Sequence, residues 1–356
     1  FGSNMEGTCD CHGAPIGEEN SNLIRSKFGW DYPPFEIPSD LYEEVKTTIS
    51  SLGGAKYASW VDSYKLYKEK YSEKALELEK FLANDFELPM MEEIAEGFDE
   101  ATRKSGGKVL TSFQKVCPNL LGGSADLTKS TNAKGLDGNF TKENPLGRNI
   151  CYGVREHAMG AIANGITLYG GLRTFTGAFF VFSDYMKPAI RMAALMEIQM
   201  MFVWSHDAFR VGEDGPTHEP VEQEAQIRLM EKLHNHSGRP SVMVLRPADA
   251  EETTAAWKMA MENIYTPTAL ILSRQDVTSV PNTSEAGVKK GAYIVSKDEN
   301  PQVVMLASGS EVSTLMAGAE LLRAEGVRLQ IVSVPSEAIF RQQDKAYQAE
   351  VLPQGV

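Results

Sequence analysis

Cysteine is scarce in this chain, which has four cysteines among its 356 residues. Cys9, Cys11, Cys117 and Cys151 are irregularly spaced, whereas a disulfide-stabilised secreted domain carries more cysteines in a regular framework. The sequence therefore predicts a protein of the reducing cytoplasm. The string CDCH at residues 9–12 matches neither a zinc knuckle nor a haem attachment motif, so it predicts no metal site.

Positive charge and long apolar runs are also lacking. The chain has 48 acidic residues against 35 lysines and arginines, for a formal net charge of −13. Nucleic acids and anionic membranes are bound by basic surfaces, so neither is predicted as a partner. No apolar run approaches the roughly 20 residues of a membrane-spanning helix. The first residues lack the basic lead and the apolar block of a signal peptide.

The common nucleotide-binding and hydrolase motifs are missing as well. The sequence contains no Gly-x-Ser-x-Gly, P-loop or Gly-x-Gly-x-x-Gly string. It therefore gives no support to a hydrolase, a nucleoside triphosphatase or a dehydrogenase. What is present is ordinary for a soluble globular protein, with 42% hydrophobic and 23% charged residues. The length is sufficient for two domains and part of another.

The order of the predicted elements divides the chain into four parts. Residues 1–40 are rich in Gly, Pro, Asn and Asp and are predicted to be connecting loop, and residues 41–89 to be a solvated helical linker. Residues 90–280 alternate short apolar runs with amphipathic stretches, which is typical of an α/β fold with a parallel sheet covered on both faces. After a linker at 279–293, residues 288–356 begin a second, incomplete α/β unit.

Within these units, apolar runs predict strands and amphipathic stretches predict helices. In the larger unit the predicted strands are residues 108–112, 173–176, 200–204, 242–245 and 269–272. Its predicted helices are residues 90–102, 156–169, 183–196, 220–233 and 250–263. The smaller unit is predicted to run strand, helix, strand within residues 302–336. Ligands of open parallel sheets bind beyond the carboxyl ends of the strands, where we expect His206, Arg274 and the loop at 212–218.

Glu156 and three aromatic residues each allow two interpretations. Glu156 begins the predicted helix at 156–169, where an acid ordinarily favours the helix dipole. On spacing alone, this structural interpretation is favoured over a catalytic one. Phe179, Phe182 and Tyr185 recur every three residues, so a helix would place them on one side. Such a stripe is more often core than ligand pocket.

Other polar stretches also have a structural alternative. The string LGGSADLTKSTN at 121–132 can cradle a phosphate, but most such strings are turns. Asp214 and His218 lie in GEDGPTHEPVEQ at 212–223, which is too polar for a core and too rigid for a flexible linker. Their side chains can simply staple that loop. Three arginines can form surface ion pairs, worth under about 1 kcal/mol each. They are Arg103, Arg246 and Arg274.

Taken in order, the strings of this chain resemble the transketolases, a family of thiamine-diphosphate enzymes. The matching strings are HGAPIG (12–17), FGWDYPPFEIP (28–38), GGSADLT (122–128), YGVREHAMGAIANGI (152–166), RMAALM (191–196), GEDGPTHEPVEQ (212–223), LRPAD (245–249), TALILSRQ (268–275) and ASGSEV (307–312). They span nearly the whole chain, and those around Glu156 and His218 are the most specific.

The resemblance implies a three-domain α/β architecture with thiamine diphosphate as cofactor. This chain resembles the tail of the diphosphate-binding domain, a long connector, the complete pyrimidine-binding domain and part of the C-terminal domain. The GDG metal motif of the family is not in these residues. The ligands of the Mg²⁺ or Ca²⁺ ion are therefore expected in the part of the first domain that this sequence does not contain.

The resemblance also implies roles for acid–base residues. Glu156 resembles the carboxylic acid that hydrogen-bonds the pyrimidine ring of the cofactor. It must be able to carry a proton, which burial of a carboxyl favours. This role replaces the helix-dipole interpretation. His218 resembles the group that handles the proton of a substrate hydroxyl, Asp214 the residue that orients this hydroxyl, and His12 a histidine near the reacting carbons.

Cofactor and substrate contacts follow in the same way. The side chains expected to contact the cofactor besides Glu156 are Phe179, Phe182, Tyr185 and Asp126, the first three forming an aromatic pocket for the pyrimidine ring. The side chains expected to bind the sugar phosphate are Arg103, Ser130, His206, Asp214, His218 and Arg274. Arginine suits a phosphate because its guanidinium can bind two oxygen atoms at once.

Two stretches depart from the family pattern. Cys9 stands where the family usually has a histidine, and residues 228–246 form a longer stretch than usual, in which His234 and His236 have no counterpart. We interpret the sequence as a transketolase that forms a homodimer with active sites between its subunits. The alternatives are another thiamine-diphosphate enzyme, such as deoxyxylulose-phosphate synthase or dihydroxyacetone synthase, and a non-catalytic transketolase-like subunit.

Overall fold

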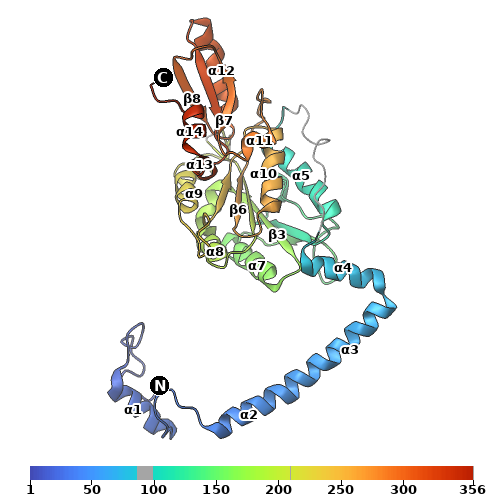
Figure 1. The fold of residues 1–356 in the computed structure, drawn as a ribbon, viewed down its shortest axis with the longest axis vertical. Helices are drawn as coiled ribbons and strands as arrows, with labels where there is room; N and C mark the ends of the chain where they lie inside the picture. The colour runs from blue at the N-terminus through green and yellow to red at the C-terminus, as the bar shows by residue number, and fades with distance from the viewer. Residues whose placement is uncertain (86–98, 209, 356) are drawn as a thin grey trace. The chain divides into compact units, whose positions relative to one another are not determined.

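The chain forms two compact units, Phe1–Glu77 and Leu78–Val356. A computed structural model describes residues 1–85, 99–208 and 210–355 (Figure 1). Among these residues no helix combines the length and the apolar character needed to cross a membrane. The predicted helix at 90–102 lies mostly outside them.

The smaller unit is helical. After α1 (Gly17–Phe28), helix α2 spans Ser39–Ile49 and leads through a π-helical turn, Ser50–Gly54, into α3 (Ala55–Lys70). Helix α4 follows at Ser72–Ala83. The predicted run of charged helix after residue 41 is therefore confirmed.

Helix α1 was predicted as loop, and that prediction is wrong. The first turn of α1 carries Glu18 and Glu19, and its last turn carries Arg25 and Lys27. This arrangement favours a helix because acids complement the positive end of the helix dipole and bases the negative end. Gly29 ends the helix in a left-handed conformation with a φ of 61°. The acids in the first turn, the bases in the last turn and the glycine after it therefore account for α1, although none of its residues is buried.

Six parallel strands form the main sheet of the larger unit, in the order β2-β1-β3-β4-β6-β5. The strands are β1 (Leu120–Ser124), β2 (Asn149–Cys151), β3 (Arg173–Phe179), β4 (Met201–Ser205), β5 (Met243–Leu245) and β6 (Thr268–Ile271). The predicted parallel-sheet α/β fold is confirmed, and so are the strands predicted from residue 173 onward.

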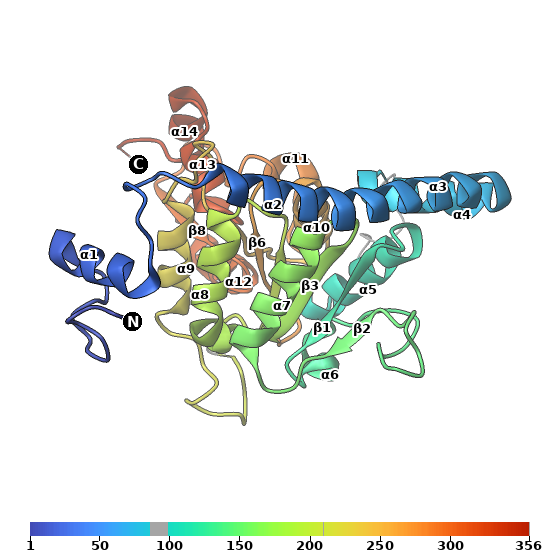
Figure 2. The same ribbon diagram turned by 90° about the horizontal axis from the view of Figure 1, so that it is seen from below.

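Helices cover both faces of this sheet. The helices are α5 (Thr102–Val116), α7 (Glu156–Tyr169), α8 (Ser183–Leu195), α9 (Gln223–Glu231) and α10 (Ala250–Glu262). Along β4, Met201 and Val203 belong to the core cluster of α5 and α10, whereas Phe202 and Trp204 belong to that of α7 and α8. This alternation places the two clusters on opposite faces. Figure 2 shows α7 and α8 side by side on one of them.

The predicted strand at 108–112 is wrong, because these residues belong to α5. Val109, Leu110 and Phe113 are buried there, and their spacing fits one face of a helix. A short apolar run cannot be assigned to strand or helix from periodicity alone. In the folded protein these residues pack in the same core cluster as Trp257 of α10, which stabilises the helix.

Strands β1 and β2 were not predicted, and β1 lies in the Gly-rich string. A β-carbon on Gly122 would lie 2.1 Å from the carbonyl oxygen of Phe175, and one on Gly123 would lie 1.9 Å from that of Ile150. The two glycines are therefore needed for the close approach of neighbouring backbones. The short helix α6 (Thr128–Thr131) follows. The hydroxyls of Ser124 and Thr128 bond to each other over 2.7 Å, so these two side chains serve the turn.

A second sheet of three strands, in the order β7-β9-β8, begins after the short helix α11 (Glu285–Val288). Its strands are β7 (Tyr293–Lys297), β8 (Val303–Ala307) and β9 (Leu329–Ser333), and its helices are α12 (Glu311–Ala324), α13 (Glu337–Arg341) and α14 (Lys345–Val351). The predicted strand, helix and strand within 302–336 are confirmed. Strand β7, which pairs antiparallel with β9, was not predicted, since it begins at the end of the expected linker.

A buried carboxyl joins α10 to this second sheet. Glu252 accepts hydrogen bonds from the hydroxyls of Tyr293 at 2.7 Å and Ser333 at 2.6 Å, and from the backbone N–H of Ala248 at 2.7 Å. Burial, helped by the nearby charge of Asp249, raises the pKa of Glu252 from 4.5 to about 7. The folded protein therefore holds this proton more tightly than the unfolded chain does.

We expect the free energy of unfolding to depend on pH through Glu252. Because its folded pKa is raised, its contribution is fully present below the unfolded value and is lost as pH rises through about 7. In Glu252→Gln this dependence disappears. The difference in unfolding free energy between variant and wild type should therefore change by up to about 3 kcal/mol between pH 4 and pH 8. Urea denaturation at a series of pH values measures it.

The matched control for this experiment is Glu320→Gln, because Glu320 belongs to the same compact unit but has a largely exposed side chain. Its stability curve should run parallel to that of the wild type. A parallel curve for Glu252→Gln as well would mean that Glu252 does not titrate differently in the folded and unfolded states.

Candidate active site

Polar and aromatic side chains gather where the six parallel strands end. All carboxyl ends of a parallel sheet lie at one edge, where open α/β folds bind their ligands. Residues at or just after the ends of β1, β2, β3, β4 and β6 are, in that order, Asp126, Glu156, Phe179, His206 and Arg274. The expectation that His206 and Arg274 flank one edge of the sheet is confirmed.

Rings of three aromatic residues and two histidines adjoin one another at this edge. The Phe179 ring stacks on the His206 ring with centroids 3.7 Å apart and on the Phe182 ring at 6.0 Å. The rings of His218 and Phe182 are edge-to-face with centroids 5.4 Å apart, and the Tyr185 ring lies 6.2 Å from that of Phe182. Phe179 ends β3 and is not helical, so the 3-10 turn at 180–182 brings these rings together.

His206 is buried at the centre of this group, with 3% of its surface exposed. Its Nδ1 atom is 2.9 Å from the Ser205 hydroxyl, and its Nε2 atom is 3.9 Å from the Asp214 carboxylate. Burial, together with the positive charges of Arg103 and Arg274, lowers the pKa of His206 to about 3. The imidazole is therefore neutral at physiological pH, and one of its nitrogen atoms can accept a hydrogen bond.

We expect the His206 ring to stay neutral between pH 5 and pH 8. Its folded pKa of about 3 lies below this range, whereas an exposed histidine ordinarily changes its charge within it. Nuclear magnetic resonance of ¹⁵N-labelled histidine measures the charge and tautomer of each ring. The prediction is wrong if the His206 signals show a titration midpoint above pH 5.

Two arginines bring positive charge to the same place. Arg103 Nη1 donates to the carbonyl oxygen of Ser130 over 2.6 Å, and Arg274 forms an ion pair with Glu213 at 3.6 Å. Burial and the charge of Arg274 lower the pKa of Arg103 below its ordinary value. Among the described residues, none accepts a hydrogen bond from the buried Nε of Arg103. Two neighbouring guanidinium groups with spare donors fit an anion such as a phosphate.

The loop at 212–223 is held by hydrogen bonds within itself, and its side chains also lie at the site. Within it, the backbone N–H of His218 donates to the carbonyl oxygen of Gly215 over 3.0 Å, and the Thr217 hydroxyl is 2.8 Å from His218 Nδ1. These bonds fix the imidazole, as the structural interpretation expected. Its ring nevertheless lies beside Phe179 and Phe182, and Asp214 lies beside His206. The loop is therefore both rigid and part of the site.

Glu156 is the first residue of α7 and follows β2, so it lies at the same edge of the sheet. Its position in the first turn agrees with the helix-dipole interpretation. Only 8% of its surface is exposed, and among the described residues none donates a hydrogen bond to its carboxyl. A buried carboxyl usually has a partner, so the Glu156 carboxyl is available to bond a ligand atom.

Two predicted residues are not brought into contact with the others. Asp126 is exposed, with a φ of 60°, and no bond joins its side chain to the described residues. His12 is exposed and belongs to the smaller unit, as does Cys9, which is a free thiol. The contacts of the larger unit therefore neither include His12 nor bear on its predicted role.

The long stretch 228–246 borders a different cavity. This cavity has a volume of about 650 Å³, and His234 and His236 line it together with Lys187 and Arg191 of α8. Both histidines are exposed. Among the described contacts, none links them to the aromatic and arginine group at the sheet edge.

Arg246 was considered as a surface ion pair, and that interpretation is wrong. Only 5% of its surface is exposed, and its guanidinium binds Asp207, Glu224 and Glu311. Its three partners come from distant positions, so no local pattern identifies them.

The family models decide what this fold and site belong to. The model described as the transketolase pyrimidine-binding domain matches residues 99–279, half of the chain. The chain belongs to the transketolase family. The model for the transketolase thiamine diphosphate-binding domain matches residues 1–89, and that for the transketolase-like C-terminal domain matches residues 291–356.

Individual transketolases agree with this membership. The chain is 43% identical to the transketolase of Geobacillus stearothermophilus over 99% of its own length and 53% of the relative, and 44% identical to that of Bacillus subtilis over 100% and 54%. The solved transketolase of Leishmania mexicana superposes with a TM-score of 0.88 at 36% identity, covering 100% of this chain and 52% of that one. The chain thus spans about half the length of the transketolases it matches.

Proposed function

We propose that the whole protein is a transketolase, which reversibly transfers a two-carbon ketol unit from a ketose phosphate to an aldose phosphate in the pentose phosphate pathway. The observation that carries this proposal is the grouping of Arg103, Arg274, His206 and His218 with the aromatic rings at one sheet edge. Paired arginines suit the phosphate of the sugar, and the neutral His206 together with the His218 ring suits its hydroxyl groups. Membership of the transketolase family supports the same reaction.

The residues present fit the pyrimidine half of thiamine diphosphate. When bound, the cofactor supplies an electron sink that allows the bond next to a sugar carbonyl to break. The stacked rings of Phe179 and Phe182 offer an aromatic wall for a planar ring. Glu156 would hold the pyrimidine nitrogen through a proton on its buried carboxyl, for which the structure describes no other partner. Tyr185 and Asp126 are proposed as further contacts.

The metal ion that accompanies a diphosphate does not fit these residues. Among the described residues, no group of three or more His, Cys, Asp and Glu side chains could hold a metal ion. We therefore assign no metal ligand among the described residues. The Mg²⁺ or Ca²⁺ ion would be bound elsewhere in the whole protein.

On the substrate side, the chain's own residues bind, orient and move protons. Arg103 and Arg274, with Ser130, would hold the phosphate of the sugar. His218 would take and return the proton of a substrate hydroxyl at Nε2, because its Nδ1 is engaged with the Thr217 hydroxyl, 2.8 Å away, to which it can donate. Asp214 and the neutral His206 would orient the hydroxyl groups by hydrogen bonds. His12 is proposed to act near the reacting carbons.

The domain boundaries, assembly and location are proposed in the same terms. We assign residues 1–40 to the tail of the diphosphate-binding domain, 41–89 to a helical linker, 90–280 to the pyrimidine-binding domain and 288–356 to the C-terminal domain. The family relationship supports a homodimer whose subunits share each active site. The four free cysteines are consistent with the reducing cytoplasm.

Product analysis with the full-length protein tests the proposed reaction. With thiamine diphosphate, Mg²⁺, a ketose phosphate and an aldose phosphate, mass spectrometry should detect an aldose phosphate two carbons shorter than the donor and a ketose phosphate two carbons longer than the acceptor. A deoxyxylulose-phosphate synthase would instead consume pyruvate and release carbon dioxide. No two-carbon transfer by the cofactor-loaded protein would contradict the proposal.

A further inference from the structure

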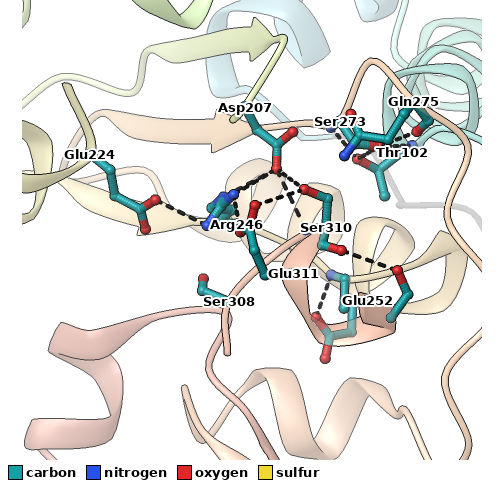
Figure 3. Close-up of polar contacts among 12 residues, drawn as sticks. Thr102, Asp207, Glu224, Arg246, Glu252, Ser273, Gln275, Ser308, Ser310 and Glu311 are labelled. Carbon is teal, nitrogen blue, oxygen red and sulfur yellow. Dashed lines mark hydrogen bonds and ion pairs between the residues drawn. The ribbon is translucent and has the colours of Figure 1, made fainter. Parts of the chain in front are cut away.

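Three segments that are distant in the sequence meet at one buried guanidinium. Arg246, directly after β5, lies 2.9 Å from the carboxylate of Asp207 and 3.0 Å from that of Glu224, and it also pairs with Glu311 (Figure 3). Asp207 follows His206 at the end of β4. Glu224 is in the first turn of α9, and Glu311 begins α12 in the C-terminal part of the chain.

Burial makes these contacts depend on one another. Burial alone would lower the pKa of Arg246, but the carboxylates of Asp207, Glu224 and Glu311 raise it above its ordinary value. The guanidinium is therefore permanently charged. Removing one partner of a buried ion pair leaves the others without compensation, which costs more than the loss of a surface pair. We therefore expect the segments that carry Asp207, Glu224 and Glu311 to be ordered, or to lose their order, together.

The C-terminal contacts wrap closely around Arg246. The Ser310 hydroxyl donates to Asp207 over 2.8 Å, and the backbone N–H of Arg246 donates to the carbonyl oxygen of Pro335 over 2.9 Å. A β-carbon on Gly309, whose φ is 60°, would lie 2.6 Å from the Arg246 side chain. The string ASGSEV at 307–312 therefore provides a glycine for close approach, a hydroxyl and a carboxylate to the same hub.

Two of the anchored segments carry site residues. His206, whose backbone is held in a left-handed conformation with a φ of 64°, directly precedes Asp207. Such a conformation in a non-glycine residue persists when the surroundings hold it. Glu224 directly follows the loop at 212–223, which carries Asp214 and His218. Arg246 therefore binds the residue that follows His206 and the residue that follows the 212–223 loop.

We propose that Arg246 is a positioning residue through which the C-terminal domain sets the geometry of His206 and of the 212–223 loop. This inference rests on the proposed function for its catalytic consequence. Its structural consequence, the ordering of the loop and of the His206 segment, is independent of the reaction. A purely structural role would hold the domains together without affecting either site segment.

The experiment compares Arg246→Lys with the wild type in the full-length protein loaded with thiamine diphosphate and Mg²⁺. Lysine keeps the charge but cannot bind three carboxylates with a planar fork. We expect kcat/KM for a phosphorylated donor to fall by about ten- to a hundredfold, because small displacements of site residues are costly. We also expect faster hydrogen–deuterium exchange in residues 212–223 and around His206 than in the wild type.

The matched control is Arg323→Lys, because Arg323 also bonds several polar side chains, Asp298, Glu320 and Ser296, but these lie within the C-terminal part. It should leave both measurements at wild-type values. Unchanged exchange in the two segments of folded Arg246→Lys would overturn the inference. So would wild-type kcat/KM in that variant when the wild type is active.

Two milder variants keep the test decisive if Arg246→Lys does not fold. Ser310→Ala removes the hydroxyl that binds Asp207, and Glu311→Gln removes one carboxylate from the C-terminal side. Both should increase exchange in the His206 segment, by less than Arg246→Lys would. Wild-type exchange in both variants would overturn the inference. Absence of two-carbon transfer by the wild type would instead contradict the proposed function, since the exchange measurement does not depend on activity.

Discussion

Replacing Glu156 by glutamine in the full-length protein should lower the rate of two-carbon transfer by about a hundredfold or more. The amide keeps the shape of the side chain and its place at the start of α7. It cannot carry or release the proton that the pyrimidine ring requires, and acid–base groups of this kind contribute about 10²- to 10⁴-fold. Steady-state kinetics with saturating thiamine diphosphate measure the change. Because the side chain is buried without a described partner, the fold itself should tolerate the substitution.

Glu251→Gln is the control for the Glu156 experiment, because Glu251 also lies in the first turn of a helix, α10. If Glu156 were only an acid that complements the helix dipole, Glu156→Gln would lose about 0.3–1 kcal/mol of stability and keep its activity. We expect unchanged activity for Glu251→Gln alone. Activity close to wild type in Glu156→Gln would remove Glu156 from the mechanism.

Replacing Arg274 by alanine should weaken the use of phosphorylated sugars selectively. Arg274 and Arg103 lie close enough for the charge of one to lower the pKa of the other, and an anion would relieve this repulsion. Losing a charged hydrogen bond of about 1.5–3 kcal/mol corresponds to a roughly ten- to hundredfold lower kcat/KM. The effect should appear in KM for the aldose phosphate. It should be absent for the same aldose without its phosphate, which gives each variant an internal reference.

Arg341→Ala is the matched control for the arginine experiment, because Arg341 is an exposed residue of α13 that pairs with Glu337. It should leave the kinetics of both acceptors unchanged. An equal loss for the phosphorylated and unphosphorylated acceptors in Arg274→Ala would show that Arg274 supports the fold of the site and does not bind the phosphate.

The sequence predicts elements well where local signals agree. The helix predicted at 156–169 coincides with α7, because an acid begins the apolar pattern and Gly170 follows its last residue. The apolar run around Val109 was ambiguous, since its fit to one helix face depends on the partner helix α10. Strand β1 was not predicted because Gly122 and Gly123 are atypical of strands. Here they allow the close approach of the neighbouring backbones. Such contacts between distant segments are not written in the local pattern.

The same distinction applies to the site. His206 and Arg274 could be placed at the sheet edge because parallel strands all end there. The burial of Arg246 could not be predicted, because its carboxylate partners come from residues 207, 224 and 311. The residues that hold the site in place are thus harder to predict from sequence than those expected to contact the ligands.

The most direct test of the account is a crystal structure of the full-length protein with thiamine diphosphate bound. We predict that a carboxyl oxygen of Glu156 lies within about 2.5–3.0 Å of a pyrimidine nitrogen, with the ring against Phe179 and Phe182. A Glu156 side chain that points into water, with the pyrimidine ring bound elsewhere, would contradict it.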